Sequence, residues 1–316
     1  MSKKFDAVCI GLAVQDILLT GVRSDALSRD TTYANDCLVT SGGDANNQAI
    51  TLGRLGDKVA PVFCISCDPI GESVYTALRN EPLNLSFIIR KPDAQMALSV
   101  VVVDPDGNRS FICRRGNKAF YLGREDIHDD MLSNTKIVTI GSLYSLPGLD
   151  GPPVADILKC ARESGAVTVC DMTADMNHIG PEGEKKVFPF IDYLIPSLEE
   201  GIYTTNETNP EKIADAFLAM GVRNVAVKLG KGGSFFKNRK EKFYCESYPV
   251  KAVDTTGCGD CFTGGFTHGL IKGLSHRDCM KFGNACGAIN ATHLGAHHAI
   301  VDEKQVLEFM STHKNV

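Results

Sequence analysis

The sequence predicts an α/β fold, in which helices cover both faces of a mainly parallel sheet and a small second β-sheet projects from this body. Short β-rich apolar runs alternate with helical patterns along most of the 316 residues, which is typical of parallel strands joined by helices. Residues 98–113 break this rhythm, because two apolar runs there flank a polar turn. No internal repeat or long linker is present, so residues 1–316 are expected to form a single domain.

The alternating runs define the elements of the body. The expected strands are residues 5–10, 59–65, 136–140, 166–170, 193–195 and 225–229. The expected helices are residues 47–55, 73–80, 153–164, 210–220, 260–272 and 276–293.

The second sheet is predicted from segments outside this alternation. Residues 98–103 and 109–113 read as a β-hairpin around the five-residue turn 104–108. Residues 38–40 and 87–89 are expected to add strands to it. The small sheet is therefore assigned to segments near residues 12–41 and 84–118.

Bulk properties exclude several classes of function. The net charge is −5 and no dense Lys/Arg cluster occurs, which argues against nucleic acid as a partner. No apolar run approaches the roughly 20 residues needed to cross a bilayer, so no membrane partner is expected. Asp16 interrupts what would be the apolar core of a signal peptide, and the expected location is cytoplasmic.

The most informative segment is DTTGCGD, residues 254–260, where a turn with two glycines opens onto an apolar helical run. Glycines leave nothing bulky in the way of a ligand. The first amides of a helix lack internal partners and lie at the positive end of its dipole, so they attract anions. We interpret the segment as a phosphate cradle with Asp260 as a general base beside it. The alternative is an ordinary glycine turn before a buried helix.

The cysteines raise a zinc site as a rival interpretation. The chain has 12 of them, and the pairs Cys64/Cys67 and Cys258/Cys261 have C-x-x-C spacing. Three histidines follow further along: His293, His297 and His298. The first pair ends an expected strand and the second lies within the glycine turn, so neither has the surroundings of a zinc knuckle. Buried free cysteines behave as small apolar residues, and this is the favoured interpretation.

Segment 254–260 resembles the signature of ribokinase-type (PfkB family) carbohydrate kinases, which usually reads DTTGAGD; here Cys258 replaces the alanine. The resemblance implies a ribokinase-like three-layer sandwich with a β-sheet lid over the sugar. It also implies an ATP-dependent sugar kinase that uses Mg²⁺, in which Asp260 takes the proton from the sugar hydroxyl. The amides of Gly257, Cys258 and Gly259 would form the anion hole.

The resemblance extends to residues that would bind the sugar. The run SGGDANNQA, residues 41–49, is similar to the N-terminal signature of the family, in which Gly42, Gly43 and Asn47 would contact the substrate. Asp44 stands where ribokinases often carry lysine, which argues against ribose itself. Helix capping by Asp44 or Asn46 is the alternative explanation of this run.

Two further residues are implied to face the sugar. Asp16 matches an aspartate that binds substrate hydroxyls in the family; by itself it would read as a solvated loop residue. Arg114 matches an arginine that faces the substrate in relatives acting on keto-acid sugars, and two solvent-facing arginines, Arg114 and Arg115, are the alternative. An inward Arg114 would indicate an acidic or long-chain sugar.

The nucleotide and metal residues are implied by position. Lys228, Gly230, Gly233 and Asn284 match nucleotide contacts, although no P-loop or Rossmann glycine motif is present. Glu200, in the run PSLEE, matches the acidic residue that organises Mg²⁺ through water, and Ser197 replaces the customary asparagine. Asp254, Thr256 and Gly295 match a K⁺ site found in some relatives.

Two other functions stay open at this point. A nucleoside kinase of the same superfamily would need an aromatic base pocket, for which Phe111, Phe120 and Tyr121 are the candidates near the lid. A non-catalytic sugar or nucleotide sensor is the second alternative. Because exposed sheet edges need covering and relatives often dimerise through their lids, a homodimer through the lid is expected.

Overall fold

The computed structural model describes residues 3–23, 25–105, 109–175 and 179–313. The strands are β1 Phe5–Ile10, β2 Val14–Thr20, β3 Asp36–Gly42, β4 Val59–Val62, β5 Cys64–Ser66, β6 Ile89–Lys91, β7 Leu98–Val103, β8 Arg109–Arg114, β9 Thr135–Leu143, β10 Val167–Met172, β11 Tyr193–Ile195, β12 Asn224–Lys228, β13 Ser234–Asn238 and β14 Lys242–Cys245. The helices are α1 Asp44–Arg54, α2 Pro69–Arg79, α3 Asp129–Ser133, α4 Pro152–Glu163, α5 Gly180–Glu184, α6 Leu198–Thr205, α7 Pro210–Ala219, α8 Cys258–Ile271, α9 His276–Ala291 and α10 Glu303–Thr312.

Within the described residues, the main sheet has the strand order β14-β13-β12-β11-β10-β9-β1-β4. Pairing is parallel from β4 through β12 and antiparallel at β13 and β14. The predicted mainly parallel sheet is thus confirmed. Strands β13 and β14, which the apolar runs did not predict, follow the glycine turn after β12 and close that side of the sheet.

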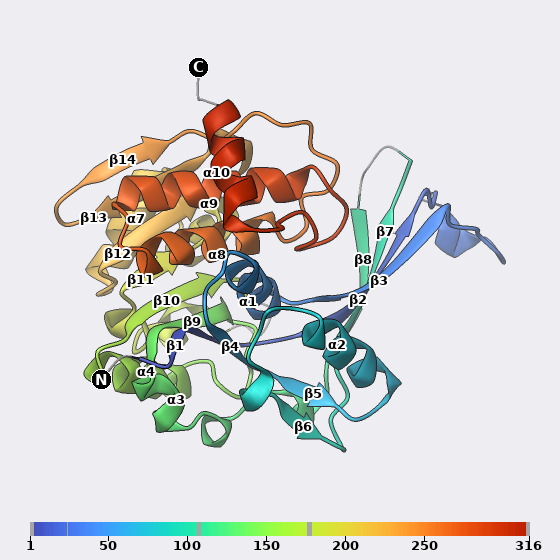
Figure 1. Cartoon of the computed structure of the whole chain (residues 1–316), viewed down its shortest axis with the longest axis horizontal. Helices are drawn as coiled ribbons and strands as arrows, with labels where there is room; N and C mark the ends of the chain where they lie inside the picture. Colours follow the sequence, from blue (N-terminus) through green and yellow to red (C-terminus); the bar gives the residue numbers. More distant parts are fainter. Residues whose placement is uncertain (1–2, 24, 106–108, 176–178, 314–316) are drawn as a thin grey trace.

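Helices cover both faces of the main sheet (Figure 1). Successive strand residues point to opposite faces, and two groups of apolar side chains follow this alternation. Val169 and Ala226 pack with Phe266 of α8. Their neighbours on the other face, Cys170 and Val225, belong to a core that includes residues of α4 and α7. The body therefore has three layers, and α8 is held rigidly against the sheet.

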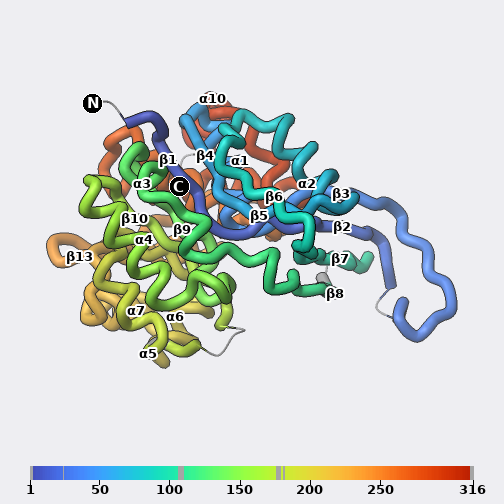
Figure 2. Tube along the Cα trace, turned by 90° about the horizontal axis from the view of Figure 1, so that it is seen from below, coloured from blue at the N-terminus to red at the C-terminus, as the bar shows by residue number. Residues whose placement is uncertain are grey.

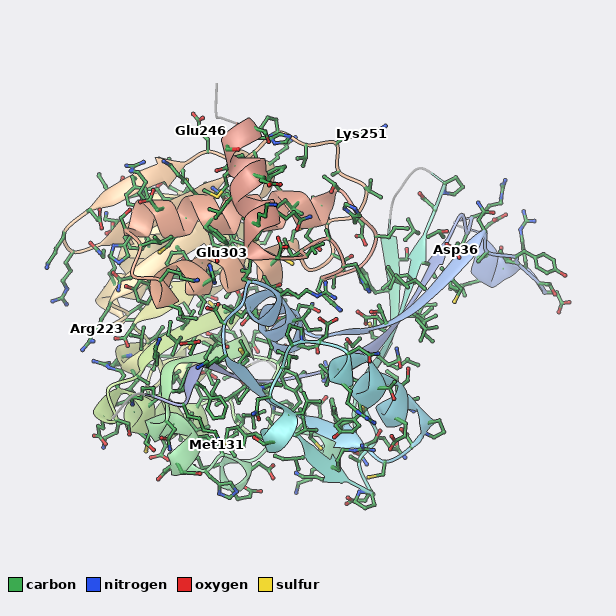
Figure 3. All side chains as sticks on the ribbon, viewed as in Figure 1. Asp36, Met131, Arg223, Glu246, Lys251 and Glu303 are labelled. Atoms are coloured by element: carbon green, nitrogen blue, oxygen red, sulfur yellow. The ribbon has the colours of Figure 1, made fainter. Side chains whose placement is uncertain are left out.

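The second sheet has the order β3-β2-β7-β8 and projects from the body (Figures 1 and 2). Figure 3 shows Asp36, the first residue of β3, on this projecting part. The predicted hairpin is confirmed as the antiparallel pair β7 and β8, and residues 106–108 of its turn lie outside the described residues. The expected strand at 38–40 is part of β3. Strand β2, which was not among the expected strands, carries Asp16.

Two element predictions were wrong. The expected strand 59–65 is divided into β4, in the main sheet, and β5, which leaves that sheet to pair with β6. Residues 87–89 do not extend the second sheet, because Leu85–Phe87 forms a 3₁₀ turn and β6 pairs with β5. Both errors come from tertiary pairing, since an apolar run does not reveal which sheet it will join.

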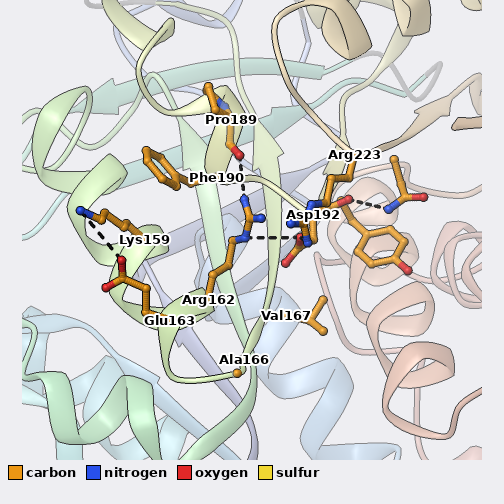
Figure 4. A pocket seen from close by; sticks show the side chains of 12 residues that line it. Lys159, Arg162, Glu163, Ala166, Val167, Pro189, Phe190, Asp192 and Arg223 are labelled. Atoms are coloured by element: carbon orange, nitrogen blue, oxygen red, sulfur yellow. Dashed lines mark hydrogen bonds and ion pairs between the residues drawn. The ribbon is translucent and has the colours of Figure 1, made fainter. Parts of the chain in front are cut away.

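A hollow of about 730 Å³ lies at the amino ends of the parallel strands (Figure 4). Asp192 is buried there and its carboxylate accepts from Arg223 (Nη1 to Oδ1, 2.7 Å) and from the amide of Thr168 (3.0 Å). Arg162 donates in turn to the carbonyl of Pro189 (2.7 Å). The charged side chains of this hollow tie α4, β10 and β11 together.

None of the described helices combines the length and apolar character of a membrane span.

Close packing of α1 on α8 depends on Gly264. A Cβ at Gly264 would lie 2.8 Å from the Cβ of Thr51, which is closer than carbon atoms pack. We expect Gly264→Val to lower the free energy of unfolding by about 1–3 kcal/mol through overpacking, measured by urea denaturation.

Gly232→Val is the matched control, since a Cβ at this exposed position would meet only Leu229 Cβ, at 3.6 Å. Its effect should stay within about 0.5 kcal/mol. Equal destabilisation by the two variants would contradict the packing argument.

Candidate active site

The candidate site lies where the strand order reverses. From β1 the chain passes to β4 on one side, and strands β9 to β12 follow on the other. In open α/β sheets, ligands bind outside the carboxyl ends of the strands at such a point. A cavity of about 800 Å³ is found there, and its lining includes Asp44, Asp171, Ser197, Glu200, Lys228, Gly230, Gly233, Gly257, Cys258, Gly259, Asp260 and Asn284. The cavity thus brings together most of the residues that sequence motifs assign to nucleotide, anion hole and base.

Asp260 lies in the first turn of α8, whose N-cap is Gly257. Gly257 has φ +70°, and a Cβ there would overlap the carbonyl of Ala296, so this tight turn requires glycine. The Asp260 carboxylate points toward α1, where Asn47 Nδ2 donates to its Oδ2 (2.7 Å). Burial, with the charges of Asp44 and Asp171 added, raises the pKa of Asp260 well above its usual range.

Asp171 and Lys228 form a buried ion pair that sequence reasoning did not anticipate. The Lys228 Nζ lies 2.6 Å from Asp171 Oδ1, and Thr263 Oγ1 donates to Oδ2 (2.7 Å). A Cβ at Gly259 would stand 3.3 Å from Lys228 Nζ, so the ammonium borders the glycine turn. Burial lowers the pKa of Lys228, but the neighbouring Asp171 and Glu200 outweigh it and the pKa is raised. Lys228 therefore stays charged beside the anion cradle.

A sequence signal for Asp171 existed. It directly follows the expected strand 166–170, and a polar residue at the carboxyl end of a parallel strand is placed at the ligand-binding edge of the sheet. What the sequence does not show is the partner, because Asp171 and Lys228 are far apart in the chain.

Asp44 lines the cavity rather than capping its helix. The N-cap of α1 is Gly43, with no side-chain cap, and Asp44 accepts a hydrogen bond from Ser142 Oγ instead. Ser142 has φ +75° and Tyr144 φ +77°, a backbone strain that is often found at functional sites. The end of β9 is thereby shaped to hold Asp44, whose pKa is raised chiefly by burial.

Asp16 lies on β2, at the base of the projecting sheet, and is only 7% exposed. Its carboxylate occupies the space that a side chain on Gly42 would need, and Gly43, with φ +97°, packs on the carbonyl of Leu12. Burial, and then the charge of Asp44, raises the pKa of Asp16 to about 7. Asp16 is thus a buried strand residue and not a solvated loop residue.

Arg114 is not brought to these residues. It pairs with Leu98 in the hairpin, whereas Cys113 pairs with Ser99 and Ser99 with Asp16. Paired residues share a face and successive residues alternate, so Arg114 leaves the sheet on the face opposite to Asp16. The exposed Arg114 donates from Nη2 to the carbonyl of Met96 (2.8 Å).

Glu200 and Ser197 border the cavity at the start of α6. The Ser197 amide donates to Glu200 Oε2 (2.6 Å), and the Glu200 amide donates to Ser197 Oγ (3.2 Å), which is a capping box. Burial raises the pKa of Glu200 to about 7, although Lys228 opposes the shift. The carboxylate is an oxygen ligand of the kind that Mg²⁺ takes, directly or through water.

Asn284 and the loop around Asp254 have structural contacts. Asn284 Nδ2 donates to the carbonyl of Glu246 (3.0 Å), which holds one wall of the cavity. The Asp254 carboxylate accepts from the amides of Thr256 and Gly295 (both 2.9 Å) and so joins two loops beside the glycine turn. These three loop residues, implied to bind K⁺, do lie together.

The structure gives no support to the zinc interpretation. Across residues 3–23, 25–105, 109–175 and 179–313, no three His, Cys, Asp or Glu side chains are grouped as metal ligands. Cys64 is buried with its Sγ on the carbonyl of Ala119 (3.7 Å), and Cys261 is fully buried. These two are buried, as the favoured interpretation expects, whereas Cys67 is exposed and Cys258 is partly exposed.

The three aromatic candidates for a nucleoside pocket do not all lie together. Phe120 is 1% exposed within the main core, where its ring contacts Tyr121 (centroids 5.5 Å apart). Phe111 is 54% exposed on the projecting sheet.

Comparison with known proteins shows which family the sequence matches. The family described as pfkB family carbohydrate kinase matches residues 4–303. A ribokinase from Haemophilus influenzae is 26% identical over 286 residues, 89% of this chain and 90% of the relative. A 5-dehydro-2-deoxygluconokinase from Clostridium perfringens is 27% identical over 319 residues, 97% of this chain and 91% of the relative.

Comparison with solved structures gives a matching fold. The ribokinase of Thermotoga maritima superposes with a TM-score of 0.82 at 27% identity, covering 97% of this chain and 99% of that one. The Arabidopsis thaliana ribokinase complexed with ribose and ATP has a TM-score of 0.81 at 24% identity, with coverage of 98% and 99%. These superpositions confirm the ribokinase-like fold.

The buried ion pair predicts a large effect of one substitution. Lys228→Met would leave Asp171, whose side chain is 2% exposed, without its counter-ion. We expect the free energy of unfolding to fall by about 3–5 kcal/mol, measured by chemical denaturation at neutral pH.

Lys242→Met is the control, because its ion pair with Glu211 (2.7 Å) lies on the surface, with 58% of the lysine side chain exposed. Its loss should cost less than about 1 kcal/mol. Similar losses in the two variants would show that burial does not set the strength of the Lys228 pair.

Proposed function

The chain belongs to the pfkB family of carbohydrate kinases, and we propose that it transfers the γ-phosphoryl group of ATP to a hydroxyl of a neutral monosaccharide, with Asp260 as the general base. The observation that carries the proposal is the placement of Asp260. Its buried carboxylate faces the cavity at the first turn of α8, between Asn47 and the glycine turn. A base there can reach a hydroxyl while helix amides face the phosphate.

The environment of Asp260 suits proton abstraction. Burial raises its pKa, and Asn47 opposes part of that shift by donating to the charged form. A carboxylate whose ionised form is poorly stabilised accepts a proton more readily than a carboxylate in water. A base is most effective when its pKa lies near the working pH. Asn47 fixes the direction of the carboxylate, so the acceptor hydroxyl is deprotonated as it attacks in line.

Charge on the moving phosphoryl group is balanced by the glycine turn and by Lys228. The amides of Gly257, Cys258 and Gly259 lie at the N-terminus of α8, where the helix dipole attracts anions. Lys228 Nζ borders Gly259, and Gly230, Gly233 and Asn284 line the same cavity.

The residues present fit a magnesium ion. Glu200 offers carboxylate oxygen at the cavity wall, and Mg²⁺, when bound with ATP, would neutralise phosphate charge. We also propose that the loop of Asp254, Thr256 and Gly295 offers oxygen ligands to K⁺, for which omission of K⁺ from the assay is the direct check.

A neutral sugar fits the charges better than a sugar acid. Asp16 and Asp44 act on each other electrostatically, as do Asp44 and Asp260, so three carboxyl groups surround the region between β2 and α8. Carboxylates accept hydrogen bonds from hydroxyls but repel another carboxylate. Arg114, the residue that would have favoured an acid, leaves the opposite face of the sheet.

The projecting sheet is proposed as the lid. It carries Asp16 at its base and extends beyond the body (Figure 1). A kinase must exclude water from the phosphoryl group, since otherwise it hydrolyses ATP, and a sheet hinged beside the substrate provides such a cover.

Asp260→Asn tests the catalytic assignment. Asparagine keeps the size of the side chain but cannot take the proton, so kcat should fall by about 10²–10⁴-fold while ATP binding is retained. Turnover is measured as sugar-dependent ADP release, and ATP binding by calorimetry.

Asp278→Asn, on the exposed side of α9, is the control and should leave turnover unchanged. The acceptor panel contains neutral sugars, sugar acids and nucleosides. Full turnover by Asp260→Asn would disprove the base, and a preference for sugar acids would disprove the substrate class.

An apolar row on the second sheet supports a homodimer. Val39, Ile17, Val100 and Ile112 are paired across the four strands and therefore share one face. Val39 is 55% and Ile112 48% exposed. We propose that a second copy of the chain covers this face, since such rows rarely remain in water.

Val39→Asp should convert the dimer to a monomer, because it would bury a charge in the interface. The mass in solution is measured by light scattering after gel filtration. Leu307→Asp, at an exposed position (51%) on α10, is the control and should stay dimeric. A monomeric unmodified chain at micromolar concentration would contradict the proposal.

A further inference from the structure

The first turn of α8 carries two thiols, Cys258 and Cys261, on either side of Asp260 in the sequence. Cys258 is partly exposed and lines the cavity. Cys261, three residues further along α8, is fully buried. A reachable thiol therefore stands one helical turn from a protected thiol, at the centre of the proposed phosphate cradle.

The two side chains contact different groups around the start of α8, and Cys261 Sγ also accepts from Thr51 Oγ1 (3.5 Å). Cys258 Sγ lies 3.9 Å from the carbonyl of Asp254 and 3.8 Å from Asn290 Nδ2. Cys261 Sγ lies 3.5 Å from the carbonyl of Ala296. Residues three apart on a helix are side by side, and Gly295, next to Ala296, is bonded to the Asp254 carboxylate.

We propose that Cys258 and Cys261 form a redox modification site, at which a peroxide joins the two sulfurs in a disulfide and thereby disables the phosphate cradle. The effect on activity rests on the proposed kinase function. Formation of the disulfide rests only on the placement of the two thiols.

Cys258 reacts first because it is the partly exposed thiol that lines the cavity, whereas Cys261 is buried. The sulfur of Cys258 attacks the peroxide, the O–O bond breaks, and a sulfenic acid and one water are formed. The sulfur of Cys261 then displaces the sulfenic hydroxyl, which leaves as a second water with the proton of the Cys261 thiol. Two thiols are oxidised to one disulfide, and one peroxide is reduced to two waters.

Bond formation must deform the first turn. Cβ atoms three residues apart on a helix are about 5–6 Å apart, whereas a disulfide requires about 3.5–4.5 Å. The Cys258 amide meets the carbonyl of Thr255 at 3.3 Å, a long hydrogen bond that such a movement would break. The movement would displace the amides of Cys258 and Gly259, on which the anion hole depends.

The sequence makes this disulfide easy to detect. Trypsin cleaves after Lys251 and Lys272 and releases residues 252–272, whose only cysteines are Cys258 and Cys261. The unmodified full-length protein is treated with stoichiometric hydrogen peroxide, blocked with iodoacetamide and digested. We expect peptide 252–272 to lose two hydrogens and to carry no alkyl group, and dithiothreitol to reverse this.

Kinase activity is followed in the same samples. Oxidation should lower kcat by about 10²-fold, as expected for loss of an anion-hole donor, and dithiothreitol should restore it. Cys261→Ala, which keeps Cys258, should form no disulfide, so that its peptide 252–272 should not lose two hydrogens. Cys286→Ala, a buried cysteine of α9, is the matched control and should respond as the unmodified protein does.

Each result has one meaning. An oxidised peptide that is alkylated at Cys261 and oxidised only at Cys258 would overturn the disulfide. A disulfide that leaves kinase activity unchanged would overturn its effect on the cradle. A chain that forms the reversible disulfide but phosphorylates no sugar even when reduced would support the modification site and contradict the kinase function.

Discussion

The site depends on the charge of one buried lysine. Lys228 is in direct contact with Asp171 and acts electrostatically on Asp44, Glu200 and Asp260. Burial chiefly raises the pKa values of Asp44, Glu200 and Asp260. The neighbouring carboxylates add to this effect, since one ammonium group does not balance four carboxyl groups. Because its pKa is raised, the Asp260 carboxylate binds a proton more readily than a carboxylate in water, which suits a general base.

The backbone brings these charges together through glycine. Gly257 permits the tight turn into α8, Gly264 lets α1 approach that helix, and Gly42 leaves room for the Asp16 carboxylate. A larger side chain at any of these positions would remove the contact. The glycines therefore set the distances between elements, and their role is not to supply flexibility. The bond between Asn47 and Asp260 is the result, since it joins the first turns of α1 and α8.

Much of the arrangement could be predicted from the sequence. The glycine turn at 254–260 indicated a helix N-terminus with Asp260 at its first turn, and the structure has both. The parallel strands of the body followed from the alternating runs, whereas β13 and β14 did not. The partner of each strand did not: 59–65 was read as one strand, although its two halves pair in different sheets.

What the sequence determined by itself is local: periodicity, turn chemistry and the residue types at each motif. These depend on neighbours a few positions apart, for which spacing is enough. Tertiary structure alone decided which distant groups meet, as with Lys228 and Asp171, 57 residues apart, or Ser142 and Asp44. It also decided the face of a strand, and thereby separated Arg114 from Asp16. The physical reason is that pairing and burial are properties of the assembled sheet, and a buried charge acquires its pKa only from the groups packed around it.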